Sequence, residues 1–229
     1  MKKLSTHTTT LETVLGWCYF VFQLLFLGPI VVVINLFLPH PLNETELNII
    51  LFVINFIAIL IIFRKFLWAN FQKVLTAPFQ VLKTAGVGFI LYDICSILIS
   101  YLVYAVDPDF INANDNNIGQ MIDSNFALMS ICTVLLVPVV EETLYRGLLF
   151  RCLYEKNALM GYILSTAIFA LIHVVGYIGS VDALTLCLCF AQYLPAGVFL
   201  AWSYVKSDSI WTPILIHMAV NQIGILAMR

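Results

Sequence analysis

Charged residues are scarce in this chain of 229 residues, since they make up 10% of it and hydrophobic residues make up 62%. An ordinary soluble domain contains about 25% charged residues, so the composition excludes a soluble globular protein and a disordered chain. The formal net charge of -2 provides no basic excess for phosphate groups, which excludes a nucleic-acid partner. The composition instead predicts a protein whose surface faces a lipid bilayer.

Two further patterns are missing from the sequence. The 6 cysteines lie within apolar runs and show no repeated Cys-x-x-Cys spacing, which disfavours both a disulfide framework and a thiolate metal site. We therefore interpret them as small buried hydrophobic residues. No internal repeat is visible, which disfavours a secondary transporter built from two related halves.

Long apolar runs predict an all-α fold, a polytopic membrane helix bundle. A bilayer core about 30 Å thick requires about 20 apolar residues per helix, and the sequence contains about seven runs of that kind. Residues 64–80 mix basic and apolar side chains, which predicts an amphipathic helix lying in the interface. Residues 107–125 are rich in Asp and Asn and are expected to form a solvated loop. The predicted spans are residues 14–38, 47–63, 81–106, 126–154, 160–178, 183–205 and 210–228.

The basic residues predict an orientation for this multi-pass integral membrane protein. If the N-terminus is cytoplasmic, every Lys and Arg except Arg229 lies at or near the cytoplasmic side. The positive-inside rule therefore places the N-terminus in the cytoplasm and the C-terminus outside, in the plasma membrane if the source is prokaryotic. The first apolar run is too long for a signal peptide, so we interpret it as a retained span.

Ionisable and amide side chains within the spans are the candidate functional residues. A charged group inside a membrane costs several kcal/mol, so each one is a hypothesis of function. These groups concentrate in the fourth, fifth and seventh predicted spans. They are Glu141, Glu142, Arg146, His173, His217 and Asn221.

Helical spacing predicts how these groups face one another. Glu142 and Arg146 are four residues apart and can pair on one helix face, whereas Glu141 is rotated by about 100° from Glu142. His173 lies at a matching depth in the next span, so we expect the candidate groups to line one water-accessible cavity. Taken alone, the Glu142–Arg146 pair is more often structural, and a single histidine is as often a packing residue as a functional one.

Three short motifs together resemble those of a known family. Glu-Glu-x-x-x-Arg from Glu141, Phe-x-x-x-His ending at His173, and His-x-x-x-Asn from His217 occur in this order on separate hydrophobic helices. They resemble the CPBP family, which comprises CAAX prenyl endopeptidases of the Ras-converting type and bacteriocin-processing or self-immunity (Abi) proteins. The resemblance divides the chain into variable N-terminal transmembrane helices, residues 1–125, and a catalytic helix core, residues 126–229.

The resemblance implies intramembrane cleavage of a membrane-associated peptide or lipidated protein, such as a prenylated CAAX-type or bacteriocin-like substrate. It implies that Glu141 is the catalytic base, that His173 holds and polarises the attacking water, and that His217 and Asn221 form the oxyanion hole. Glu142 and Arg146 then support the site. Neutral imidazole and carboxamide N–H groups can stabilise a tetrahedral oxyanion, which agrees with this division.

Alternatives remain for the cofactor and for the function. Glu141, His173 and His217 could make a zinc site with an open water position, although the chain lacks His-Glu-x-x-His and asparagine is an uncommon zinc ligand; we therefore predict no cofactor. The same fold without cleavage would give a membrane adaptor or a bacteriocin self-immunity protein. A proton or ion carrier that uses the glutamate and histidines as a relay is a third hypothesis.

Overall fold

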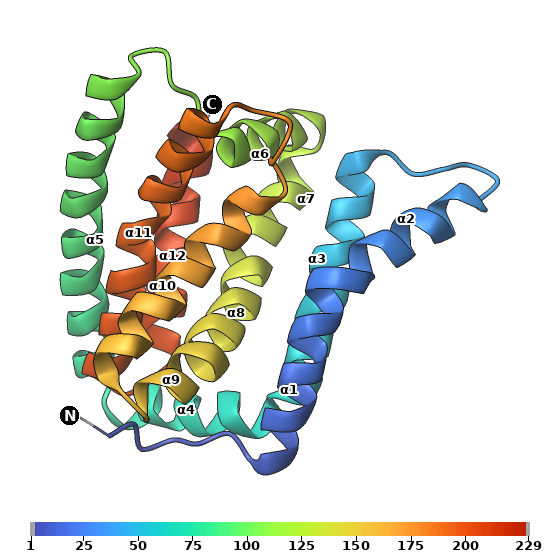
Figure 1. Ribbon diagram of the computed structural model, residues 1–229. Coiled ribbons are helices and arrows are strands. Elements are labelled where there is room, and N and C mark those ends of the chain that lie inside the picture. Colours follow the sequence, from blue (N-terminus) through green and yellow to red (C-terminus); the bar gives the residue numbers. More distant parts are fainter. Residues whose placement is uncertain (1–2, 228–229) are drawn as a thin grey trace.

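The computed structural model describes residues 3–227, which form a bundle of helices without a β-sheet among them (Figure 1). Within this part of the chain, 6 helices are long and apolar enough to cross a membrane, and a seventh apolar helix has 17 residues. The all-α polytopic bundle is therefore confirmed. The α-helices and π-helical segments (η) are α1 (Thr10–Phe22), η1 (Gln23–Leu27), α2 (Gly28–Leu36), α3 (Glu44–Ile62), α4 (Arg64–Thr76), α5 (Pro78–Val106), α6 (Ala113–Ser124), α7 (Phe126–Ile131), η2 (Cys132–Leu136), α8 (Val137–Glu142), η3 (Thr143–Phe150), α9 (Arg151–Tyr154), α10 (Ala158–Val175), α11 (Ala183–Ser207) and α12 (Trp211–Ala227).

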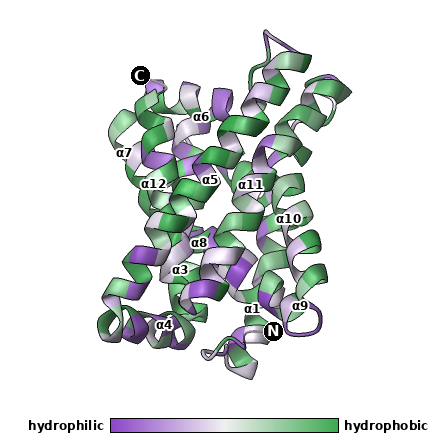
Figure 2. Cartoon of the chain, turned by 90° about the vertical axis from the view of Figure 1, so that its left-hand side faces the viewer, coloured by the Kyte–Doolittle hydropathy of each residue, from purple (hydrophilic) through white to green (hydrophobic). Residues whose placement is uncertain are grey.

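Apolar side chains cover the outside of the bundle, as expected of a protein solvated by lipid. Figure 2 shows hydrophobic residues along the helices, and hydrophilic residues gathered in α4 and near α6 at the opposite end. The fourth span, Phe126–Tyr154, is the most enclosed, and every residue of η3 within it is buried. It therefore forms the centre of the bundle, where polar groups can be shielded from lipid.

Helix α4 lies across one end of the bundle, where it joins α3 to α5 (Figure 1). Glu12 fixes its start, because this buried carboxylate accepts hydrogen bonds from the backbone N–H groups of Lys65 at 3.0 Å and Phe66 at 2.9 Å. An anionic side chain at a helix N-terminus also interacts favourably with the positive end of the helix dipole. The segment that was expected to lie in the interface is thus a helix, which ends at Thr76 rather than at residue 80.

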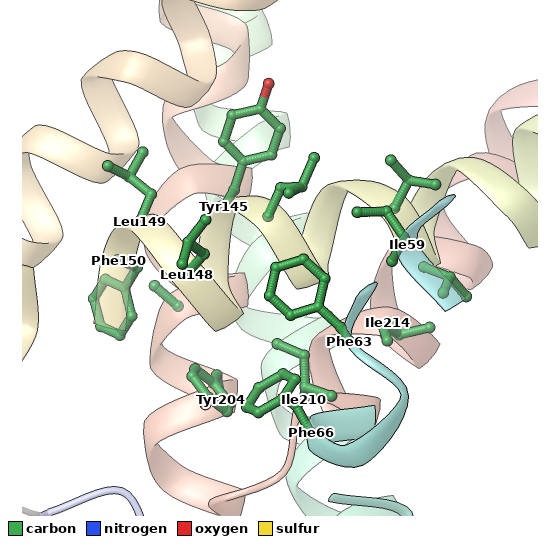
Figure 3. Packing of buried hydrophobic residues seen from close by; sticks show 14 of the residues in the cluster. Ile59, Phe63, Phe66, Tyr145, Leu148, Leu149, Phe150, Tyr204, Ile210 and Ile214 are labelled. Carbon is green, nitrogen blue, oxygen red and sulfur yellow. The ribbon is translucent and has the colours of Figure 1, made fainter. Parts of the chain in front are cut away.

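The main hydrophobic core packs between α4 and the centre of the bundle. Figure 3 shows Phe63 and Phe66 close to Leu148, Tyr204 and Ile210. These side chains are almost completely buried. The core packs the fourth span against α4 at one end of the bundle. The cavity described below lies towards the other end, at α6.

The prediction of a loop over residues 107–125 was wrong for Ala113–Ser124, which form α6. Asn112 caps this helix, since its side-chain oxygen accepts from the N–H groups of Asn114 and Asp115. Met121 and Ile122 are buried against Met129 and Ile225 of neighbouring helices. The dense Asn and Asp residues suggested solvent on all sides, but a short apolar face is enough to dock the helix.

The fourth span contains π-helical segments on both sides of Pro138, at η2 and η3. Proline lacks an N–H and prevents the regular hydrogen bond to the carbonyl four residues before it, which accounts for the irregular helix upstream of Glu141. Pi-helical segments are frequent at functional sites because they redirect side chains. This span positions Glu141 and Glu142, at the end of α8.

Candidate active site

Glu141, His173 and His217 meet at the centre of the bundle, from α8, α10 and α12. The Glu141 Oε2 atom lies 3.7 Å from His173 Nε2 and 4.0 Å from His217 Nε2. These three residues and Asn221 line a cavity of about 1210 Å³. The structure therefore brings together the four residues for which the sequence predicted catalytic roles.

Glu142 points away from Glu141 and binds two partners. Its Oε1 atom accepts from Arg146 Nη1 at 2.9 Å and from His217 Nδ1 at 2.9 Å. Glu142 is completely buried and Arg146 is 2% exposed. The guanidinium also donates to the Ala196 carbonyl at 3.0 Å and lies 4.1 Å above the centre of the Phe169 ring. Arg146 is thus well satisfied, and Glu142 connects it to the imidazole of His217.

His173 is held in place by its neighbours. Its Nδ1 atom lies 2.8 Å from the backbone oxygen of Phe169, and the rings of these two residues are 4.5 Å apart. The ring of Tyr193 from α11 stacks on the other side, at 4.3 Å and an interplanar angle of 28°. Phe169 therefore contacts the imidazole, and Tyr193 completes a fixed orientation.

These contacts assign the tautomers of both histidines. A carbonyl and a carboxylate can only accept, so Nδ1 of His173 and Nδ1 of His217 must each carry a hydrogen. When the imidazoles are neutral, both Nε2 atoms present lone pairs to Glu141. The Oε2 atom of Glu141 is buried and has no hydrogen-bond partner within residues 3–227. Three acceptors thus converge on one point, which needs a proton, a water molecule or a cation between them.

Asn221 lies one turn beyond His217 on α12. Its Nδ2 atom donates to the backbone oxygen of Thr133 in η2 at 2.8 Å. This bond uses one of the two amide hydrogens, so the second remains for another acceptor. Asn221 therefore faces the cavity with a fixed carboxamide.

The donor types of Glu141, His173 and His217 are those that zinc accepts in catalytic sites. Each imidazole also has the second partner at Nδ1 that commonly orients a metal-binding histidine. However, no group of three His, Cys, Asp or Glu residues in the described part of the chain is spaced to hold a metal ion.

Sequence reasoning missed three features of the site. Glu142 was expected to pair with Arg146 alone, but it also accepts a hydrogen bond from His217. Tyr193 and Thr133 were not identified, although both line the cavity. Their contacts join helices that are distant in sequence, and only Gln192 and Pro195 near Tyr193 marked that region as unusual.

Comparisons with known proteins match the part of the chain that carries the three motifs. Residues 123–223 match the family described as type II CAAX prenyl endopeptidase Rce1-like. The "Putative membrane peptidase YdiL" of Bacillus subtilis (strain 168) is 29% identical over 124 residues, which cover 54% of this chain and 45% of that protein. The chain thus spans less than half the length of this curated relative, and no solved structure matches it. The match contains all three motifs in their expected order, so residues 123–223 are similar to the type II CAAX prenyl endopeptidase Rce1-like family, the CPBP group that the motifs resemble.

Proposed function

We propose that this protein is a membrane-embedded endopeptidase that hydrolyses a peptide bond of a membrane-associated peptide or lipidated protein. The observation that carries the proposal is the buried, unpartnered Oε2 atom of Glu141, which faces two imidazole Nε2 atoms inside a cavity. A carboxylate without a fixed partner is free to take a proton. Groups used only for packing would be expected to satisfy one another instead.

In the proposed reaction, Glu141 removes a proton from a water molecule as its oxygen attacks the carbonyl carbon of the substrate. The carbonyl π electrons move to the oxygen, which becomes the oxyanion. The oxyanion then re-forms the carbonyl as the C–N bond breaks, and the proton on Glu141 passes to the leaving amine, which gives a carboxylic acid and an amine. His173 holds the water through Nε2, and Phe169 and Tyr193 fix the orientation of that imidazole.

His217 and Asn221 are proposed to stabilise the oxyanion, as electrostatic stabilisation of this kind is usually the largest catalytic contribution. Because Nδ1 of His217 is used by Glu142, this histidine can donate through Nε2 only as an imidazolium. The buried charges support that state: Glu141 and Glu142 contribute two negative charges and Arg146 one positive charge. One proton added to an imidazole makes the cluster neutral.

Catalysis without a metal remains part of this proposal, and zinc is its alternative. If bound, zinc would supply a water of lowered pKa and polarise the substrate carbonyl. Activity of protein purified in a chelator, with elemental analysis, tests the two versions. Full activity with no stoichiometric zinc is expected, whereas activity that is lost on chelation and restored by zinc would overturn the metal-free version.

Cleavage itself is tested by comparing membrane peptides from cells that produce wild-type protein or Glu141→Gln. The amide preserves the shape of the side chain and removes the base, so peptides produced by wild type should be missing from the variant. Equal peptide profiles would favour the adaptor or self-immunity hypothesis. Proton or ion flux in liposomes without cleavage would favour the carrier.

A further inference from the structure

The cavity extends from the candidate active site to residues of α6. Helix α6 lies at the end of the bundle opposite to α4 (Figure 1). The cavity lining there includes Glu44 at the start of α3 and Asp115 in the first turn of α6. Both residues are exposed rather than buried in the core. Among the described residues that line the cavity there is no lysine or arginine. The mouth of the cavity therefore has carboxylates without basic partners.

Asp115 is connected to the active site by a short series of contacts. Its Oδ1 atom lies 3.5 Å from the hydroxyl of Tyr193, whose ring stacks on His173 at 4.3 Å. His173 in turn lies 3.7 Å from Glu141. The Asp115 carboxylate is thus separated from the reacting group by two side chains. An extended peptide advances about 3.3 Å per residue, so Asp115 can reach a substrate residue within about four positions of the cleaved bond.

Thr133 provides a separate indication that the cavity receives a polar ligand. Its side chain is 7% exposed, lines the cavity, and has an Oγ1 atom without a hydrogen-bond partner in the described part of the chain. A buried hydroxyl without a partner costs free energy unless a ligand or water satisfies it. The backbone oxygen of the same residue holds Asn221. An extended peptide has N–H and C=O groups that suit such a position.

From these observations we infer that the cavity takes an extended peptide whose segment near the cleaved bond carries a lysine or arginine, and that Asp115 binds this cation. The inference rests on the proposed function for its choice of a peptide. Glu44 contributes negative charge at the same mouth and disfavours acidic segments. The amide side chains of Asn48, Asn117 and Gln192, which also line the cavity, can bind the peptide backbone irrespective of its sequence.

The probes are fluorescein-labelled peptides of about twelve Ala, Leu and Gln residues, long enough to occupy the cavity. One series carries a single Lys at successive positions, and matched series carry Gln or Glu there. Desolvation raises the pKa of Asp115, and His173 and the Tyr193 hydroxyl only partly oppose it. The measurements are therefore made at about pH 8, well above the ordinary range of a carboxyl group.

Binding is measured by anisotropy on the full chain in detergent, in a Glu141→Gln background that prevents cleavage. At one position we expect Lys to bind about fivefold to thirtyfold more tightly than Gln, as for an ion pair that is partly shielded from water. Asp115→Asn should remove this ratio, and Asp115→Lys should favour the Glu peptide. Asp123→Asn is the matched control, because Asp123 is exposed on the same helix but does not line the cavity. It should leave the ratio unchanged.

Equal binding of Lys and Gln peptides at every position would overturn the inference, as would a Lys preference that survives in Asp115→Asn. Cleavage of the same peptides by the wild-type catalytic residues is measured separately. If wild type cleaves none of these peptides but binding still prefers Lys, the proposed function is rejected and the binding site is kept. If wild type cleaves the peptides and binding shows no charge preference, the binding site is rejected and the proposed function is kept.

Discussion

Two adjacent glutamates should respond differently to replacement by glutamine. Glu142→Gln should lower the stability of the protein, whereas Glu141→Gln should keep the stability and abolish cleavage. Glu142 is completely buried and accepts hydrogen bonds from Arg146 and His217, both at 2.9 Å. In Glu142→Gln the guanidinium, itself 2% exposed, keeps the Ala196 carbonyl but loses its counter-charge. Removing one partner of a buried ion pair costs about 3–5 kcal/mol. The glutamine oxygen retains one hydrogen bond, so we expect a loss of about 3 kcal/mol.

Glu141→Gln should leave the free energy of unfolding unchanged or slightly higher. The Oε2 atom of Glu141 has no hydrogen-bond partner in the described part of the chain and faces the Nε2 atoms of two imidazoles. Once the Glu141 charge is removed, Glu142 and Arg146 balance each other, so both imidazoles can be neutral and the amide N–H can donate to one of these nitrogen atoms. Catalytic groups are often held at such a cost in stability. Cleavage should be abolished because the amide is not a base.

The assay is thermal unfolding of purified protein in detergent, alongside cleavage of a fluorogenic peptide. A loss of about 3 kcal/mol corresponds to a fall in Tm of about 6–12 °C for a chain of this size. The stability losses of E142Q and R146M, each measured alone, should not add in the double variant E142Q/R146M, because both substitutions break the same ion pair. Equal Tm values for Glu142→Gln and wild type would refute the Glu142–Arg146 ion pair. A large fall in Tm for Glu141→Gln would refute the conclusion that the Glu141 carboxylate has no stabilising partner.

Two further predictions concern the ends of the bundle. Burial alone would raise the pKa of Asp208, but hydrogen bonds from Lys73 and Ser5 outweigh it and lower the pKa below the ordinary value of 3.8. A lowered pKa in the folded state stabilises the protein at pH values above 3.8, and this contribution is lost as the pH falls through the folded value. Asp208→Asn should therefore lower the Tm at neutral pH, and its deficit should shrink in acid; a constant deficit would contradict this. For topology, a membrane-impermeant maleimide should label Asn116→Cys on intact cells and Lys156→Cys only after lysis, in a background without the native cysteines; the reverse pattern would refute the predicted orientation.

The positions of the spans could be predicted because bilayer thickness leaves few choices for a long apolar run. The fourth span was predicted at residues 126–154, and the structure has it at Phe126–Tyr154. Amphipathic segments were harder, because composition and periodicity disagree in them. Helix α6 is rich in asparagine but places Met121 and Ile122 on one face, and this contact with the bundle was not apparent from composition.

The candidate site was only partly predictable, for a related reason. Contacts within one helix follow from spacing, so the Glu142–Arg146 pair was expected from an interval of four residues. Motif order indicated which helices would meet, but it could not show which nitrogen of His217 faces which glutamate. That choice depends on the relative rotation of α8 and α12 and determines the proton on each imidazole. Tyr193 is a similar case, since an aromatic residue in an apolar helix has no sequence feature that distinguishes stacking on His173 from ordinary packing.

The charges of the site connect the proposed mechanism with the proposed substrate. Glu141, Glu142 and Arg146 together leave one uncompensated negative charge when both imidazoles are neutral, and a single proton can compensate it. Asp115 and Glu44 add negative charge towards the mouth, where no basic residue lines the described cavity. A peptide with a nearby lysine would bring the missing positive charge as it enters. Its binding would compensate the charge of Asp115 without taking the proton from the histidines, so the same substrate that is held at Asp115 would leave the oxyanion donor in its charged form.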